Sequence, residues 1–144
     1  MRLWHKDLIQ YLPRQQLLSQ WRECCCIAKT ITKRGSPHHL LVNKVMLYPS
    51  VHFLEYTRLV IREMESRGYG VSEKSKENFL KNFSRFGDPC ECLIGADRFM
   101  FDNWHDDRYL IQCLYNLQEK EDCGGIPSDE WDKIQNKFGK YLNG

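Results

Sequence analysis

Long apolar runs are absent from this sequence. Across its 144 residues, no stretch approaches the roughly 18 consecutive apolar residues that a membrane-spanning helix requires. The first residues also lack the apolar centre of a secretory signal peptide, because Arg2, Lys6 and Asp7 fall within seven positions. We therefore expect a chain that stays in the cytoplasm and makes no contact with a membrane.

Signatures of metal and nucleotide sites are also absent, since the sequence contains no CxxC pair, no HExxH, no GxGxxG and no P-loop pattern. Cysteine is plentiful, with seven residues, but Cys24, Cys25 and Cys26 are consecutive. Adjacent helical residues point about 100° apart, so this triplet does not form a disulfide framework. We expect free thiols, with Cys24 and Cys25 in the core, and neither a metal nor a cofactor. The alternative is a structural zinc held by His105 and some of the later cysteines, which are Cys90, Cys92, Cys113 and Cys123.

Acidic residues are scarce in the first third of the chain. Residues 1–50 contain eight basic residues against two acidic ones, Asp7 and Glu23, which gives a local charge of +6. The remaining residues carry 13 basic against 17 acidic residues, or −4, so the whole chain has a net charge of only +2. A basic segment on a nearly neutral protein attracts phosphate groups, although many basic surfaces are simply solvated.

The pattern of residues 13–34 predicts the first helix. Pro13 suits its first turn, and Gly35 and Pro37 supply the stop signal. Apolar residues recur at helical spacing, at positions 17, 18, 21, 24 or 25, 28 and 31. Arg22, Lys29 and Lys33, with Cys26 between them, follow one another at steps of four, three and four on the polar face. We call Arg22, Lys29 and Lys33 the basic ridge. The pattern is equally consistent with a surface that binds a phosphate backbone and with an exposed, solvated helix face.

The remaining sequence predicts further helices and no substantial sheet. Helical patterns cover residues 50–67, 72–86, 103–120 and the segment that Ser128 caps, with Gly68 ending the first of these. Residues 35–49 and 87–97 are interpreted as connections, the latter with an optional short strand at 92–94. We therefore expect an all-α protein, with residues 1–144 forming a single compact domain of four to five helices.

The sequence LPRQQLLSQWRE, residues 12–23, resembles the first-helix motif of the pyrimidine-dimer DNA glycosylases, the family of phage endonuclease V. The matching positions are Leu12, Gln15, Leu17 and the run Trp21-Arg22-Glu23. Residues 53–71 and 105–120 are similar to later helices of that family, and the C-terminal segment is faintly similar to its aromatic tail. MRLWH together with LPRQQLL is also similar to a bacterial branch of the family.

The resemblance implies an endonuclease V-like helical fold and a DNA repair activity. The family cleaves the glycosidic bond of the 5′ pyrimidine in an ultraviolet-induced dimer and then breaks the sugar-phosphate chain by β-elimination, without a metal or a cofactor. Its nucleophile is the α-amino group of the first residue, which aligns with Met1 here. Glu23 aligns with the catalytic carboxylate. An ordinary α-amine, with a pKa near 7.7–8.0, is partly neutral at physiological pH and can form an imine with the sugar.

The same resemblance identifies DNA-binding residues. Arg2, Gln15 and Arg22 align with positions that hold kinked DNA near the lesion, whereas Lys29 and Lys33 are assigned on their spacing alone. The expected partner is damaged double-stranded DNA, and we expect a monomer.

Cys26 and the modest net charge favour an alternative, and the chain departs from the family pattern at three places. Cys26 replaces a second arginine, one residue is inserted between Arg2 and Glu23, and about fifteen are inserted within residues 72–100. The alternative is a DNA-binding protein on the same fold whose chemistry is lost or altered. An unrelated helical interaction module, matching by chance, is the third hypothesis.

Overall fold

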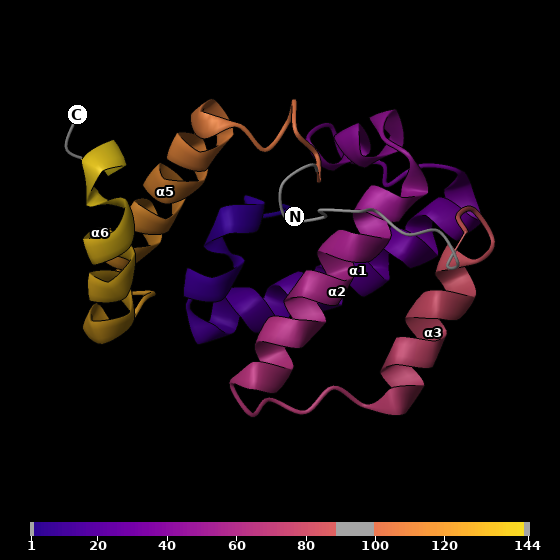
Figure 1. Cartoon of the computed structure of the whole chain (residues 1–144), viewed down its shortest axis with the longest axis horizontal. Helices are drawn as coiled ribbons and strands as arrows, with labels where there is room; N and C mark the ends of the chain where they lie inside the picture. Colours follow the sequence, from indigo (N-terminus) through magenta and orange to yellow (C-terminus); the bar gives the residue numbers. More distant parts are fainter. Residues whose placement is uncertain (1, 89–99, 143–144) are drawn as a thin grey trace.

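The computed structural model describes residues 2–88 and 100–142, and within these residues it is all-α with no strand (Figure 1). This confirms the predicted fold class. The described residues form five α-helices, which are α1 (Arg14–Arg34), α2 (Ser50–Ser66), α3 (Glu73–Phe83), α5 (Asp107–Asp122) and α6 (Ser128–Leu142). Two 3-10 helices, η1 (Lys6–Tyr11) and η2 (Val42–Leu47), complete the described elements. In the part of the chain described, no helix combines the length and the apolar character needed to cross a membrane.

Helix α1 follows its sequence signals closely. Pro13 caps it, rather than forming its first turn, and Gly35 ends it in the left-handed conformation, with φ of +83° and its N–H donating to Ile31 O over 2.8 Å. The predicted apolar stripe is buried, except that Leu18 and Cys25 are only partly covered. The opposite face remains exposed, so the helix is amphipathic as predicted.

Helices α2 and α3 pack beside α1. Helix α2 has almost the predicted bounds, and Gly68 follows its C-cap with φ of +83°. The Ser72 hydroxyl caps α3 by accepting a bond of 3.1 Å from Ser75 N–H, but α3 ends at Phe83, three residues earlier than predicted. Phe79 joins the three helices, because its ring lies 6.0 Å from that of Trp21 and 5.7 Å from that of Phe53.

Helices α5 and α6 form a pair on the other side of the molecule (Figure 1). The predicted start of α5 near residue 103 is wrong, since the helix begins at Asp107. The Asp106 side chain accepts a bond of 2.9 Å from Tyr109 N–H and is therefore the N-cap, not part of the first turn. Helix α6 begins at Ser128, as predicted.

The two 3-10 helices were not predicted from sequence. Helix η2 lies in the segment predicted as a plain connection, and η1 lies between α2 and α6, where it joins the two groups of helices. Such short helices have no hydrophobic repeat that a sequence pattern could reveal. The optional strand at 92–94 lies outside the described residues, and the single-domain prediction stays a prediction.

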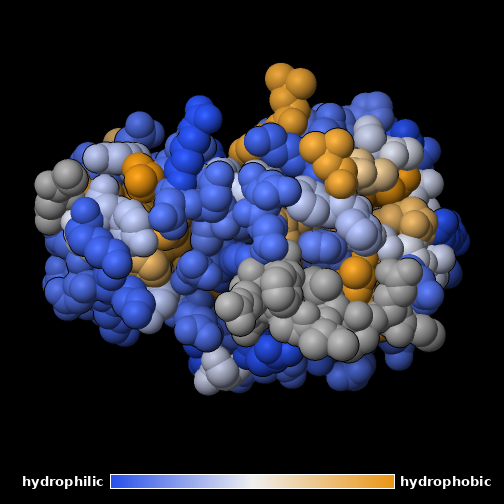
Figure 2. All heavy atoms as spheres, turned by 45° about the horizontal axis from the view of Figure 1, so that its top comes forward, coloured by the Kyte–Doolittle hydropathy of each residue, from blue (hydrophilic) through white to orange (hydrophobic). Residues whose placement is uncertain are grey.

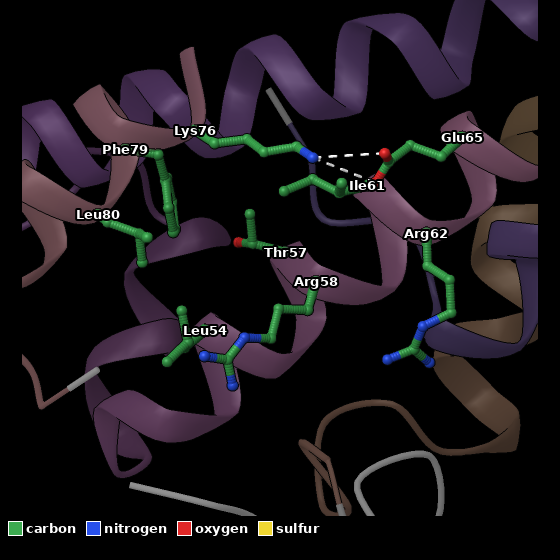
Figure 3. A pocket seen from close by; sticks show the side chains of 9 residues that line it. All are labelled: Leu54, Thr57, Arg58, Ile61, Arg62, Glu65, Lys76, Phe79 and Leu80. Carbon is green, nitrogen blue, oxygen red and sulfur yellow. Dashed lines mark hydrogen bonds and ion pairs between the residues drawn. The ribbon is translucent and has the colours of Figure 1, made fainter. Parts of the chain in front are cut away.

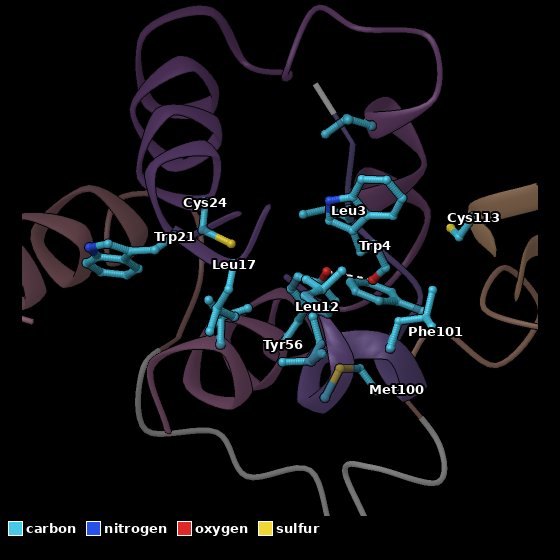
Figure 4. Close-up of a cluster of buried hydrophobic side chains, with 14 of the residues drawn as sticks. Leu3, Trp4, Leu12, Leu17, Trp21, Cys24, Tyr56, Met100, Phe101 and Cys113 are labelled. Carbon is cyan, nitrogen blue, oxygen red and sulfur yellow. Dashed lines mark hydrogen bonds between the residues drawn. The ribbon is translucent and has the colours of Figure 1, made fainter. Parts of the chain in front are cut away.

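A single hydrophobic cluster draws side chains from every described α-helix, and Figure 4 shows part of it around Leu3, Tyr56 and Phe101. The face seen in Figure 2 is mainly hydrophilic, with separate hydrophobic side chains standing on it. Exposed large apolar residues among those described are Leu40, Met46, Leu47, Leu80 and Tyr115.

Two buried histidines should make stability depend on pH. His5 and His105 are 2% and 4% exposed, and their rings stack at 5.2 Å. Burial is the main cause that lowers the pKa of both, that of His105 well below its usual value. Their Nδ1 atoms accept bonds from Asp7 N–H (3.0 Å) and Lys6 N–H (2.9 Å), which also requires the neutral ring.

We therefore expect the free energy of unfolding to fall as pH drops below about 6.5. In that range the two histidines bind protons in the unfolded chain but stay neutral in the folded chain. The loss should reach up to about 1.4 kcal/mol per pH unit for each histidine. Urea unfolding at pH 7.5, 6.5 and 5.5 measures it. His105→Asn should flatten the dependence, and His38→Gln, at an exposed position, should not. An identical pH dependence in wild type and His105→Asn would contradict this explanation.

Candidate functional site

The first residues of the described chain are buried and held by hydrogen bonds. Leu3 is fully buried and Trp4 is 6% exposed. The Gln20 side chain on α1 binds both neighbouring peptides, because its Oε1 accepts from Trp4 N–H (2.9 Å) and its Nε2 donates to Arg2 O (3.0 Å). Burial of such apolar side chains contributes about 1.5–3 kcal/mol each, so this segment is an integral part of the core.

Two tyrosines bind the same segment from other helices. The Tyr56 hydroxyl of α2 donates to Trp4 O over 2.6 Å, the bond drawn in Figure 4, and lies 3.1 Å from Gln20 Oε1. The Tyr109 hydroxyl of α5 donates to Leu3 O, also over 2.6 Å. Helices α1, α2 and α5 therefore fix the N-terminal segment in one register.

This register places the Glu23 carboxylate beside the start of the chain. Glu23 is half-buried on α1, and its Oε2 accepts a bond of 3.1 Å from Arg2 N–H. Met1 lies outside the described residues. Its α-amino nitrogen is separated by three covalent bonds from the Arg2 amide nitrogen.

No cation among the described residues forms an ion pair with Glu23. The guanidinium of Arg2 lies instead over the rings of Trp4 (5.5 Å) and Tyr109 (5.9 Å), and that of Arg22 bonds to Ser19 Oγ at 3.4 Å. Glu23 is thus not simply the partner of a neighbouring arginine, and its charge remains available to a ligand.

A polar pocket of about 410 Å³ surrounds this carboxylate. We call it the Glu23 pocket; its lining residues are Arg2, Trp4, Gln15, Gln16, Ser19, Glu23, Asn116 and Lys120. The residues at 15, 19 and 23 are one helical turn apart on α1, and those at 116 and 120 one turn apart on α5. The pocket therefore forms where α5 faces the N-terminal half of α1.

The structure brings together three of the predicted site residues, Arg2, Gln15 and Glu23. Sequence reasoning missed Asn116 and Lys120. Lys120 closes the stretch that resembles a family helix, but nothing in the sequence indicates that α5 and α1 line a common pocket.

The basic ridge lies outside this pocket. Arg22, Lys29 and Lys33 are exposed on α1, as is Cys26 between them. The predicted shared polar face is thus confirmed, and it adjoins the pocket on the same helix.

A larger hollow, of about 550 Å³, lies between α2 and α3 and contains none of the predicted site residues (Figure 3). Its lining is mainly apolar. Lys76 in this hollow lies 3.3 Å from Glu65, and Arg58 lies 2.6 Å from Glu55. Arg62 also lines the hollow and forms no ion pair among the described residues, so the hollow keeps one unpaired cation in a mainly apolar lining.

The cysteines that the structure describes are free thiols, and they differ in burial. Cys24 is fully buried, and burial raises the pKa of its thiol well above the usual value. Burial raises the pKa of the half-buried Cys25 to about 11. Both thiols therefore stay protonated at neutral pH and act as packing groups, as predicted. Within the described residues, no group of three or more His, Cys, Asp or Glu side chains could hold a metal ion, while Cys90 and Cys92 lie outside them.

The chain is thus an all-α protein with a polar, carboxylate-containing pocket next to an exposed row of cations. Its family can be stated more narrowly, because the family model described as pyrimidine dimer DNA glycosylase matches residues 1–77. This chain belongs to that family. The match contains Arg2, Gln15 and Glu23, but not Asn116 and Lys120. No curated protein and no solved structure matches the chain.

Proposed function

We propose that this protein is a DNA glycosylase with abasic-site lyase activity on pyrimidine dimers or closely related lesions. The observation that carries the proposal is the bond of 3.1 Å between Arg2 N–H and the Glu23 carboxylate. It ties the start of the chain to Glu23, the one carboxylate that the described residues contribute to the Glu23 pocket. An amine and a carboxylate side by side are the two groups that imine chemistry at a sugar needs.

The α-amino group of Met1 is the proposed nucleophile. An unperturbed α-amine has a pKa of about 7.7–8.0, against about 10.4 for a lysine side chain, so a larger fraction of an α-amine is neutral at physiological pH. Its lone pair forms a bond to C1′ of the sugar while the glycosidic bond breaks and its electron pair leaves with the base. Loss of the amine proton and opening of the sugar ring then give an imine. Removal of a C2′ proton expels the 3′ phosphate and cuts the strand.

Glu23 is the proposed proton carrier and electrostatic partner. Its negative charge stabilises the positive charge that develops at C1′, and its free lone pairs accept and return protons during ring opening and elimination. The absence of a competing ion pair among the described residues supports this role. The half-buried position strengthens the interaction relative to open water.

DNA contacts are proposed on both sides of the carboxylate. Arg2 and Gln15 line the Glu23 pocket, and Arg22 with Lys29 and Lys33 extends along the exposed side of α1. Lys120 of α5 is a further proposed phosphate contact on the opposite wall. DNA held between these groups would have its damaged nucleotide displaced from the stack, which costs least where stacking is already impaired.

The second candidate is a DNA-binding protein on the same fold without the chemistry. The exposed Cys26 favours it, because a neutral thiol interrupts the basic ridge where the family pattern has an arginine.

Nicking of ultraviolet-irradiated supercoiled plasmid, alongside an abasic-site duplex, tests the proposal. We expect both substrates to be cut and an unirradiated plasmid to stay supercoiled. Cutting of the abasic duplex alone would assign the protein to another lesion. Binding of damaged DNA without cutting of either substrate would contradict the proposal and support the second candidate.

A further inference from the structure

Helices α1 and α3 enclose a further hollow, of about 630 Å³, which we call the α1–α3 groove. Lys29 and Cys26 line it from α1, whereas Asn78, Lys81 and Arg85 line it from α3 and the turn that follows. Three of its lining residues are cations, and none is a carboxylate. The groove is therefore a positively charged surface, and Lys29 is its one lining residue that was among the predicted DNA-binding residues.

The cations of this groove have no acidic partner in the described parts of the chain. Lys29, Lys81 and Arg85 form no ion pair among the described residues. Glu77 lies one helical turn before Lys81, yet the two side chains do not pair. The opposite side of α3 differs, because Lys76 there lies 3.3 Å from Glu65 and 3.6 Å from Glu73.

The groove has a fixed shape because α3 is attached to α1 at two points. Thr32 on α1 donates its hydroxyl to Asn82 O over 2.8 Å. The buried Phe79 packs against Trp21 at a ring distance of 6.0 Å. The cations of α3 are therefore held at a set position relative to those of α1, which lowers the cost of ordering them around a ligand.

The groove continues the surface that contains the Glu23 pocket. Successive residues of a helix are rotated by 100° around its axis. On the circumference of α1, the basic ridge therefore lies between the side that faces the pocket, at positions 19 and 23, and the side that faces the groove, at position 25. The groove residues on α1 lie about eight residues beyond the pocket residues, or roughly 12 Å along the helix axis. That length corresponds to about three to four base pairs of duplex DNA.

We propose that the α1–α3 groove binds the phosphate backbone of duplex DNA beside the damaged nucleotide, with Lys81 and Arg85 each contacting a phosphate. This site adds a DNA contact to the proposed function, and the inference that the bound DNA is damaged rests on that function. The amide of Asn78 supplies a neutral hydrogen-bond donor of the kind that phosphate oxygens accept. The family match ends at residue 77, so Lys81 and Arg85 lie beyond it.

Salt-dependent binding of the intact protein to two fluorescent duplexes tests the proposal, one undamaged and one with an abasic site. The double variant Lys81→Gln/Arg85→Gln should weaken binding to both duplexes by at least about tenfold at 0.1 M salt and lower the slope of log K against log salt by about two. The matched control Arg62→Gln/Lys76→Gln removes the same charge from the α2–α3 hollow and should leave the slope within about half a unit. Thermal unfolding verifies that both variants fold.

The outcomes separate this proposal from the proposed function. Unchanged slope and affinity in the Lys81/Arg85 variant would overturn the groove site, even if wild type cuts damaged DNA. An equal loss in both double variants would also overturn it, because charge alone would then explain the effect. If the wild-type protein cuts no DNA but the Lys81/Arg85 variant alone loses DNA binding, the result would support the groove site and refute the proposed enzyme activity.

Discussion

Replacing Glu23 by glutamine should abolish strand cleavage while leaving DNA binding nearly intact. Glutamine keeps the size of the side chain, and its amide oxygen can still accept the bond from Arg2 N–H. The variant loses the negative charge and the ability to carry protons, so only the chemical steps should suffer. A loss of this kind typically costs 10²- to 10⁴-fold in rate. Single-turnover cleavage of an abasic duplex measures the rate, and fluorescence anisotropy measures binding.

The control for this experiment is Glu119→Gln, which removes the same charge from an exposed position on α5. Glu119 precedes Lys120 but does not line the Glu23 pocket. Its cleavage rate should equal that of wild type. Cleavage by Glu23→Gln within about twofold of wild type would remove Glu23 from the mechanism, whereas equal loss of binding and cleavage would make it a positioning residue only.

Borohydride added to the protein and abasic DNA should trap a covalent complex on the α-amino group of Met1. Peptide mapping by mass spectrometry locates the crosslink. A second form with one extra glycine before Met1 carries its amine three bonds further from the position that Glu23 holds. Because a displacement of about 1 Å can cost 10²-fold, we expect trapping and cleavage to fall at least that much.

Lys120 supplies the sharpest control, since it is the only lysine among the described residues that line the Glu23 pocket. Lys120→Gln should weaken DNA binding but leave the crosslink on Met1. A crosslink found on Lys120 in wild type would show that this lysine is the nucleophile. Loss of all crosslinking in Lys120→Gln at saturating DNA would show the same.

Helix positions were predictable where local chemistry sets them. Pro13, Gly35, Gly68 and Ser72 act through their own backbone or hydroxyl group, and α1, α2 and the start of α3 follow them. The start of α5 was misplaced because a cap and a first-turn acid have the same sequence signature, and Asp106 proved to be the cap.

The candidate site was predictable only in its part near the N-terminus. Arg2, Gln15 and Glu23 lie within one short stretch, so a motif can carry them. Asn116 enters the pocket because α5 docks there, which is a tertiary contact without a local signal. The buried Gln20 shows the same limit. A glutamine in an amphipathic helix is normally assigned to the surface, whereas here it is fully buried and binds two peptide groups.

The bond between Tyr109 and Leu3 joins residues 106 positions apart. During synthesis the first residues leave the ribosome early, but this partner emerges only after three quarters of the chain has been made. Contacts of such long range form late in folding, because the closure of a long loop must precede them. A nascent chain that has not reached residue 109 can form the bonds of Gln20 and Tyr56 to its N-terminal segment but lacks the one from Tyr109. On the proposed mechanism, full alignment of the terminal amine with Glu23 would therefore wait until α5 is in place.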